Sequence, residues 1–387
     1  MSIAKAKAEA VKAKLRERKP VEVVDWNLGL STGCTTLNLE MSGRPNVGMH
    51  PGLYYMFVGD AGAGKTWLAR SIMAEACYNK RYDAFSIIED NPENRGFMMS
   101  LPTYFGKLSK RLQPPSKLGP SRYLEDFYVN VQDAAKLGSF IYTLDSEDSL
   151  VPYDEFVKSM KTMRAKASKR EKEMAGDAKG AEREGEKIKG DYGMAKAKIN
   201  SNQIRIASNT VKDTGSILII LKQSRQNVNP LTARFADKTR NGGVALTYYN
   251  ANELWFSIWG KIRKRVMGKE RRTGFVMRVV IRRNSQNGKV DREVLIPFYD
   301  DYGVDDLGAC VLYLVNEKHW GVSGNPEDRD LFKKKVTAPE FKFTGTIEDL
   351  AGHIEISGKQ LELQLLTTTL WQKIENECRL QRKPRYE

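Results

Sequence analysis

One stretch of the chain, residues 54–70, limits the possible folds more than any other. It reads YYMFVGDAGAGKTWLAR, which is an apolar strand, a glycine-rich turn and the start of a helix. Four residues separate Gly59 from the run Gly64, Lys65, Thr66, and this is the spacing of a phosphate-binding P-loop. Glycines let consecutive backbone amides face one anion, and the helix adds its N-terminal partial charge. The pattern therefore predicts a nucleotide site, rather than a glycine turn that binds nothing, formed by Gly59, Asp60, Ala61, Gly62, Ala63, Gly64, Lys65 and Thr66.

A second pattern downstream predicts a metal ligand. Residues 140–144, FIYTL, form an apolar run typical of a buried strand, and Asp145 follows it directly. An acid in this place, after a P-loop, is typical of the Walker B carboxylate that holds the Mg²⁺ shell. Lys65 would reach the β- and γ-phosphates, and the Thr66 hydroxyl would bind Mg²⁺. We therefore expect ATP and Mg²⁺ as cofactors, with Thr66 and Asp145 as the metal ligands.

Polar side chains also follow two other predicted strands. Residues 84–88 lead into the acidic cluster Glu89, Asp90 and Glu93, and the apolar run ILIIL ends just before Gln223. An open parallel sheet places its chemistry at the carboxyl ends of its strands. Glu89 or Asp90 would then orient the attacking water, and Gln223 would contact the γ-phosphate. A solvated acidic loop is the alternative interpretation.

The chain is strongly basic, with a formal net charge of +15 and a pI of about 9.4. Such an excess favours a polyanionic partner, nucleic acid above all, although charge can also simply keep a protein soluble. Residues 224–243 form a long polar segment, and a loop of this length inside a compact domain is usually functional or disordered. Cations around an aromatic anchor suit single-stranded DNA, whereas the alternative is an ordinary surface loop. The candidate DNA contacts there are Arg225, Arg234, Phe235, Lys238, Arg240, Gly242 and Gly243.

The remaining segments are less specific. Residues 2–18 are rich in Ala, Lys and Glu and predict a helix that packs on this chain or on a neighbouring subunit. Residues 157–200 are almost entirely charged or small, so they form a solvated helix, a flexible insert or a DNA-facing arm. We expect further strands at 254–259, 275–282 and 294–298, the first two joined by the basic connector IRKRVMGKERR, and a small C-terminal domain at 304–387.

The sequence predicts neither a membrane-spanning segment nor a disulfide framework. No apolar run approaches the length of a membrane span, and the four cysteines form no CxxC pair. We therefore expect reduced thiols and a cytoplasmic protein.

The order of these motifs resembles the RecA family of strand-exchange ATPases. The lead-in Ser31-Thr32-Gly33, the P-loop GDAGAGKT, SIIED, YTLDSEDSLVP, GDYGMAKAK, ILIILKQSR and NGGVALTYY follow one another as in that family, over about residues 28–304. The resemblance implies an α/β fold, a RecA-type P-loop core with a mostly parallel central sheet. It also implies a helical filament on single-stranded DNA, pairing with double-stranded DNA, and ATP bound between subunits. The implied division is an N-terminal helix at 1–27, a core at 28–303 with a charged insert at about 157–190, and a small C-terminal domain.

The resemblance also assigns roles to single residues. Asp145 is similar to the family's Walker B acid and Gln223 to its γ-phosphate-sensing glutamine. Residues 182–194, which include Lys189, are similar in position to the first DNA-binding loop, and residues 224–243 to the second. In VVIRRN, Arg282 and Arg283 lie where the family has basic residues that reach the neighbouring subunit's ATP.

Three features depart from the family. The catalytic acid is not uniquely placed, the charged insert is long, and the C-terminal end CRLQRKPRYE is basic rather than acidic. These departures suggest a member that is bacteriophage-encoded or otherwise remote, and a phage-encoded one would work in the host cytoplasm. The expected function is a DNA-dependent ATPase and recombinase. A hexameric helicase-type motor and an ATP-switched filament or loader protein without turnover are the alternatives.

Overall fold

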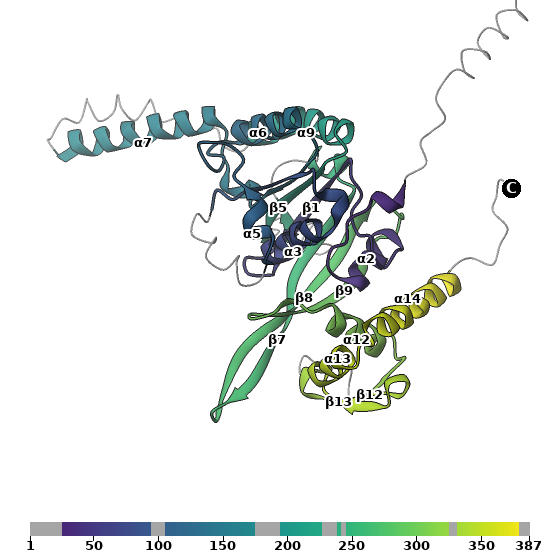
Figure 1. The fold of residues 1–387 in the computed structure, drawn as a ribbon. Helices are drawn as coiled ribbons and strands as arrows, with labels where there is room; N and C mark the ends of the chain where they lie inside the picture. Colours follow the sequence, from purple (N-terminus) through teal and green to yellow (C-terminus); the bar gives the residue numbers. More distant parts are fainter. Residues whose placement is uncertain are drawn as a thin grey trace, which may run out of the picture.

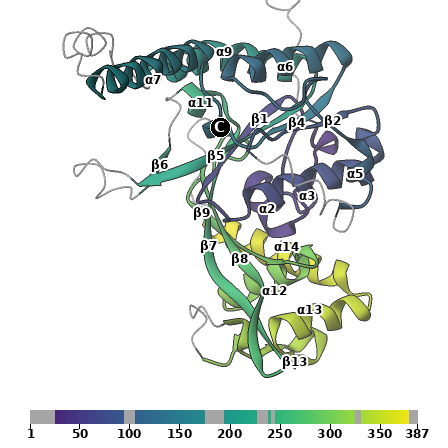
Figure 2. The ribbon, with the colours of Figure 1, turned by 90° about the vertical axis from the view of Figure 1, so that its left-hand side faces the viewer.

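A computed structural model describes residues 25–93, 105–174, 194–226, 238–240, 245–324 and 331–378. A twisted sheet lies at the centre of the molecule, helices cover both of its faces, and a smaller region lies against one end (Figures 1 and 2). The predicted N-terminal helix at 2–18 lies outside the described residues. So do the candidate DNA contacts Lys189, Arg234, Phe235, Gly242 and Gly243.

The central sheet has ten described strands in the order β10-β9-β8-β7-β1-β5-β4-β2-β3, with β6 paired to β5. The neighbours from β7 through β1, β5, β4 and β2 to β3 are all parallel, whereas β7 to β10 run antiparallel to one another. This is a mixed α/β fold with a largely parallel sheet, as expected. The strands are β1 (Leu53–Gly59), β2 (Ser86–Asp90), β3 (Leu112–Gln113), β4 (Phe140–Leu144), β5 (Ile217–Gln226), β6 (Lys238–Arg240), β7 (Asn252–Val266), β8 (Lys269–Asn284), β9 (Arg292–Tyr299) and β10 (Gly303–Val304).

The central strands of this sheet have continuous apolar sequences. Successive side chains of a strand point to opposite faces, so a strand covered on both faces is apolar throughout. In β1, Tyr55 and Phe57 pack with α2 and α3 on one face, while Tyr54, Met56 and Val58 pack with α6 and α9 on the other. The covering helices are α2 (Thr35–Ser42), α3 (Lys65–Tyr78), α6 (Leu124–Leu137), α9 (Met194–Asp213) and the short α11 (Ala245–Tyr249).

The hairpin of β7 and β8 differs from the prediction. The basic stretch expected to be a connector continues both strands, and only Met267 and Gly268 separate them. Both residues have positive φ, at 50° and 76°, which closes a two-residue turn. The outer half of the hairpin therefore extends beyond the sheet as a basic ribbon beside the C-terminal region (Figure 1).

Residues from 306 onward pack around a core of their own, to which the hairpin adds Ile262 and Val276. A three-stranded antiparallel sheet, β11-β12-β13, packs with the helices of this region. Helices and short strands alternate in this region, and α12 is largely apolar and buried rather than charged. The elements are α12 (Asp306–Asn316), β11 (Gly321–Val322), η5 (Leu331–Lys333), β12 (Val336–Ala338), η6 (Pro339–Phe341), β13 (Phe343–Gly345), α13 (Ile347–Ile356) and α14 (Gln360–Glu377).

The charged insert begins as a helix. Helix α7 (Tyr153–Met174) extends away from the body of the molecule (Figure 1), and residues 175–193 lie outside the described part. Among the described residues, no helix is both long and apolar enough to span a membrane. All four cysteines are free. The remaining short elements are η1 (Trp26–Leu28), η2 (Lys80–Tyr82), α5 (Leu108–Arg111) and η4 (Glu147–Ser149).

Candidate nucleotide-binding site

The predicted P-loop joins the carboxyl end of β1 to the amino end of α3. Gly62 and Gly64 have φ values of 72° and 96°, a backbone region that side chains strongly disfavour. A Cβ on Gly64 would lie 2.1 Å from the sulfur of Met277, and one on Gly59 would lie 2.4 Å from the carbonyl oxygen of Phe256. The turn therefore requires glycine for its backbone angles and for its close packing.

Lys65 is folded back onto this loop. Its ammonium donates hydrogen bonds to the carbonyl oxygens of Gly59, at 2.8 Å, and Asp60, at 2.7 Å. The side chain is buried, and burial lowers its pKa even though Asp145 and Asp60 favour the charged form. A cation held over the loop by carbonyl oxygens alone is available to a phosphate that enters there.

The two predicted metal ligands meet, although 79 residues separate them in the chain. Thr66 Oγ1 donates a 2.6 Å hydrogen bond to Asp145 Oδ2. Burial raises the pKa of Asp145, and the hydrogen bond from Thr66 partly opposes this. A hydroxyl and a carboxylate at the mouth of a phosphate loop are the hard oxygen ligands that Mg²⁺ prefers. Together with the glycine cradle and Lys65, they fit a Mg²⁺–nucleotide complex.

The two acids expected to orient water are engaged elsewhere, because β2 continues through them. Glu89 is buried in an ion pair with Arg70, at 2.7 Å. Asp90 accepts hydrogen bonds from the Ser121 backbone amide, at 2.8 Å, and from the hydroxyls of Ser121 and Tyr142. Burial raises the pKa of both carboxyls. The geometry therefore disfavours Glu89 and Asp90 as the acid that orients water, and gives both of them structural partners.

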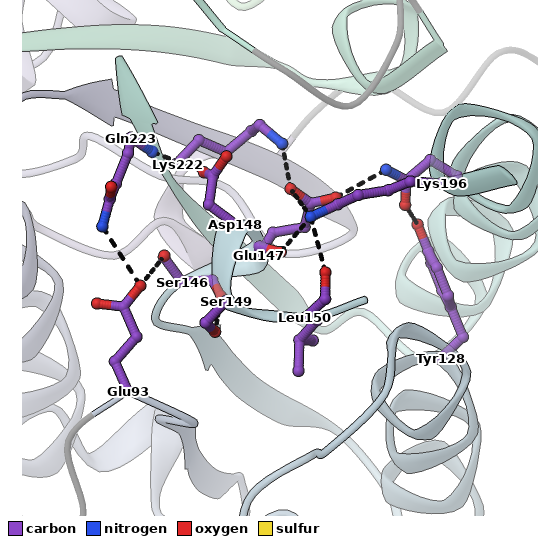
Figure 3. Close-up of polar contacts among 11 residues, drawn as sticks. Glu93, Tyr128, Ser146, Glu147, Asp148, Ser149, Leu150, Lys196, Lys222 and Gln223 are labelled. Atoms are coloured by element: carbon purple, nitrogen blue, oxygen red, sulfur yellow. Dashed lines mark hydrogen bonds and ion pairs between the residues drawn. The ribbon is translucent and has the colours of Figure 1, made fainter. Parts of the chain in front are cut away.

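A third acid of the same cluster, Glu93, lies beside Ser146 and Gln223. Glu93 Oε1 accepts hydrogen bonds from Ser146 Oγ, at 2.6 Å, and from Gln223 Nε2, at 3.4 Å (Figure 3). Ser146 is the neighbour of Asp145, so Glu93 and Gln223 lie together beside the predicted metal ligands. The sequence contained Glu93 in its acidic cluster, but the spacing alone could not show that its side chain reaches Gln223 of β5.

The described part of the second DNA-binding segment forms an arm on β5. Arg225 pairs with Thr239 and Ser224 with Arg240 across the β5–β6 ladder. Lys238 was expected to contact DNA, but its ammonium forms an ion pair with Asp60 of the P-loop. Ser224 also donates a hydrogen bond to Asp60. In this conformation the Lys238 ammonium lies at the P-loop, because the Asp60 carboxylate attracts it.

The structure does not bring Arg282 and Arg283 to the P-loop of their own chain. Arg283 pairs with Glu253 of β7, which is level with Met56 in the middle of β1 rather than with its carboxyl end. The Arg282 guanidinium stacks on Trp255, 3.7 Å from the ring centroid. Arg283 donates a 3.1 Å hydrogen bond to the Tyr248 carbonyl, while its buried Nε has no hydrogen-bond partner in the described part of the chain. A role toward ATP would therefore have to be exerted on a neighbouring subunit.

Comparisons with known proteins find similar solved structures but no similar sequence. No family model and no curated protein matches the sequence. The fold is similar to a structure titled the crystal structure of the RadB recombinase, with a TM-score of 0.43 and 14% identity. The match covers 71% of this chain and 98% of the other. A similarity at this level shows neither a family nor a function for this chain.

Proposed function

We propose that this chain is a DNA-dependent ATPase that assembles as a filament on single-stranded DNA and pairs it with homologous double-stranded DNA. The observation that carries the ATPase part is the contact between Thr66 and Asp145 at the mouth of the P-loop. The contact brings a hydroxyl and a carboxylate from distant parts of the chain together beside the folded-back Lys65, and this supports a site for a Mg²⁺–nucleotide complex.

Each residue of the site has a part in hydrolysis. The P-loop amides and Lys65 bind the β- and γ-phosphates, and Thr66 and Asp145 hold Mg²⁺, which neutralises phosphate charge when bound. Glu93 orients the attacking water, and Gln223 contacts the γ-phosphate. Arg282 and Arg283 act on the ATP of the next subunit, as cations that stabilise transition-state charge.

The DNA part of the proposal is supported by charge and by the motif order that resembles the RecA family. The net charge of +15 favours binding to a polyanion. Arg225 and Arg240 lie on the β5–β6 arm, which starts from the strand that carries Gln223. Binding through phosphates releases counterions, so affinity for single-stranded DNA should fall steeply as salt rises. An affinity that stays flat between low and high salt would contradict this electrostatic part.

The test is ATP hydrolysis with and without single-stranded DNA, followed by electron microscopy of the same samples. We expect strong stimulation by DNA and open helical filaments, and we expect Lys65→Ala to abolish hydrolysis. Closed rings with directional unwinding would indicate a helicase-type motor instead. Filaments without turnover would indicate an ATP-switched structural protein, and normal turnover in Lys65→Ala would refute the P-loop assignment.

A further inference from the structure

Two side chains of the β5–β6 arm converge on the carboxylate of Asp60, the second residue of the P-loop. Antiparallel pairing places Ser224 and Lys238 on the same face of the arm, because Ser224 lies opposite Arg240, two residues from Lys238. Ser224 Oγ donates a hydrogen bond to Asp60 Oδ1, and the Lys238 ammonium pairs with Asp60 Oδ2. Both oxygens of Asp60 therefore bind the arm at the P-loop.

This contact brings a second ammonium group to the residue that already binds Lys65. Lys65 donates a 2.7 Å hydrogen bond to the carbonyl oxygen of Asp60, whereas Lys238 pairs with its side chain. Burial would raise the pKa of Asp60, but the hydrogen bonds from Lys238 and Ser224 outweigh burial and lower the pKa. Two cations are therefore anchored on one residue at the mouth of the P-loop.

The charges around Lys65 favour a second cation if a triphosphate is to bind. The carboxylates that act on the Lys65 ammonium include those of Asp145, Asp60, Glu93 and Asp148. Mg²⁺ would neutralise part of this charge, but a nucleoside triphosphate brings more negative charge than one lysine can match. Lys238 supplies a second positive charge at the loop.

The ion pair of Lys238 and Asp60 can open without leaving a charge buried. The two side chains are 40% and 45% exposed, so water screens the pair and it is only weakly held. A terminal phosphate carries more charge than a carboxylate, and the long lysine stem can turn toward it. Gln223, the proposed γ-phosphate contact, directly precedes Ser224, so the arm meets the site at its γ-phosphate end.

We propose that Lys238 is a second phosphate-binding residue of the nucleotide site, and that it exchanges the Asp60 carboxylate for the γ-phosphate of a nucleoside triphosphate bound in the same chain. This proposal rests on the proposed nucleotide site. A diphosphate lacks the group that Lys238 contacts, so Lys238 adds to the preference for triphosphate over diphosphate. Arg282 and Arg283 are proposed to act on a neighbouring subunit, whereas Lys238 acts within its own chain and needs neither a filament nor DNA.

The test compares two nucleotides in the absence of DNA. We would measure the Kd of a non-hydrolysable ATP analogue and the Kd of ADP, each with Mg²⁺, by displacement of a fluorescent nucleotide. In Lys238→Met, which keeps the aliphatic stem, we expect the analogue to bind about tenfold more weakly and ADP to stay within about twofold of wild type. In Lys238→Arg, which keeps the charge, both affinities should stay within about threefold of wild type.

Two further variants control for the loss of charge and for the competing carboxylate. Lys212→Met removes an exposed ammonium beside Gly52, at the amino end of β1, and should keep both wild-type affinities. Asp60→Asn removes the anion that competes with the phosphate for Lys238, so it should increase the preference for the analogue over ADP by about threefold. The same change made together with Lys238→Met should not increase that preference.

The proposal is overturned if Lys238→Met keeps the wild-type affinity for the analogue, or if it weakens the analogue and ADP equally. An equal loss in Lys238→Arg or in Lys212→Met would overturn it, as would a gain from Asp60→Asn that persists without Lys238. A weaker affinity of Lys238→Met for single-stranded DNA, with both nucleotide affinities unchanged, would show that Lys238 is a DNA contact instead. A wild-type chain that binds neither nucleotide would overturn the proposed nucleotide site as well, whereas the other outcomes leave that site in place.

Discussion

The carboxyl edge of the parallel strands and the C-terminal region both bury large side chains completely, but they bury different chemistry. At the sheet edge, Arg70, Glu89, Asp90, Glu147 and Lys222 are all at most 8% exposed. In the C-terminal region a large aliphatic and aromatic cluster is buried, and the buried Glu375 of α14 pairs with Lys289 and Arg292 at its border with the sheet. A buried charge is destabilising unless it is paired and hydrogen-bonded. The charges are therefore concentrated where a binding site needs fixed polar groups, and apolar packing holds the remainder together.

The largest expected effect is a difference in ATP turnover between variants of two acids at the sheet edge, Glu93 and Asp90. Glu93→Gln should lower ATP turnover by about 10²–10⁴-fold, because the side chain that orients water loses its charge. Asp90→Asn, in the buried network, should keep turnover within about threefold while lowering stability by about 1–3 kcal/mol. Steady-state turnover and urea unfolding of both variants check this. Equal losses of turnover in the two variants would mean that the structure does not distinguish these carboxylates.

The next largest effect is a loss of folding stability, which we compare between the sheet edge and the C-terminal region. Arg70→Met leaves the buried Glu89 without its cation and should lower the free energy of unfolding by about 3–5 kcal/mol. Adding Glu89→Leu to Arg70→Met should recover most of that loss, because the stranded charge is removed.

The matched change in the C-terminal core is Leu350→Ala, which should cost about 2–5 kcal/mol through a cavity. No second substitution that removes a charge can rescue this loss. Chemical denaturation of the three variants tests the contrast, and a double variant as unstable as Arg70→Met would contradict it.

The pH dependence of stability offers a further test at the border of the C-terminal region, where the carboxyl of Asp305 is buried. Burial raises the pKa of Asp305 to about 6, although its hydrogen bond from the Gly308 amide opposes this. The folded state therefore binds the proton more tightly than the unfolded state, and this group makes the chain less stable as pH rises from about 4 to 6.

Asp305→Asn keeps the helix cap and removes the titration. We expect equal stability of variant and wild type near pH 4, and a variant more stable by roughly 3 kcal/mol at pH 7. Thermal unfolding across this range gives the measurement. A variant that loses stability at pH 7 would show that the charged carboxylate is favourable there.

The smallest effect concerns a surface feature of the C-terminal region. Thr346 and Asp349 form a capping box at the start of α13. Thr346→Ala should cost about 1 kcal/mol and should speed amide exchange in the first turn of α13. The exposed neighbour Thr344→Ala should stay within about 0.5 kcal/mol of wild type. Equal exchange in the two variants would mean that the box does not hold the helix end.

Local patterns predicted the parts of this molecule that depend on neighbouring residues. The strand at 140–144 is confirmed with its bounds, and the apolar run at 217–221 is confirmed as the inner half of β5. Glycine spacing located the turn between β1 and α3, because few sequences satisfy its backbone angles. The meeting of Thr66 and Asp145 was also expected, and it is present.

Other parts depend on contacts between distant residues and were not predictable in this way. Lys238 was assigned to DNA from its charge, but its position relative to Asp60 depends on how β6 pairs with β5. The ion pair of Glu147 and Lys222 had only a weak signal, a lysine ending an apolar run. The basic stretch IRKRVMGKERR was expected to be a connector between two strands, whereas pairing across the hairpin makes it part of both strands.

The place of β1 in the sheet has a consequence for synthesis. Its pairing partners are β5 and β7, whose first residues follow Leu53 by more than 150 positions in the sequence. At about 5–20 residues per second, a ribosome needs on the order of ten seconds or more to deliver β5. Until then β1, the apolar strand that directly precedes the P-loop, has two unpaired edges. Such edges are templates for pairing with other chains. The nascent protein is therefore most in need of chaperone protection before its nucleotide site exists.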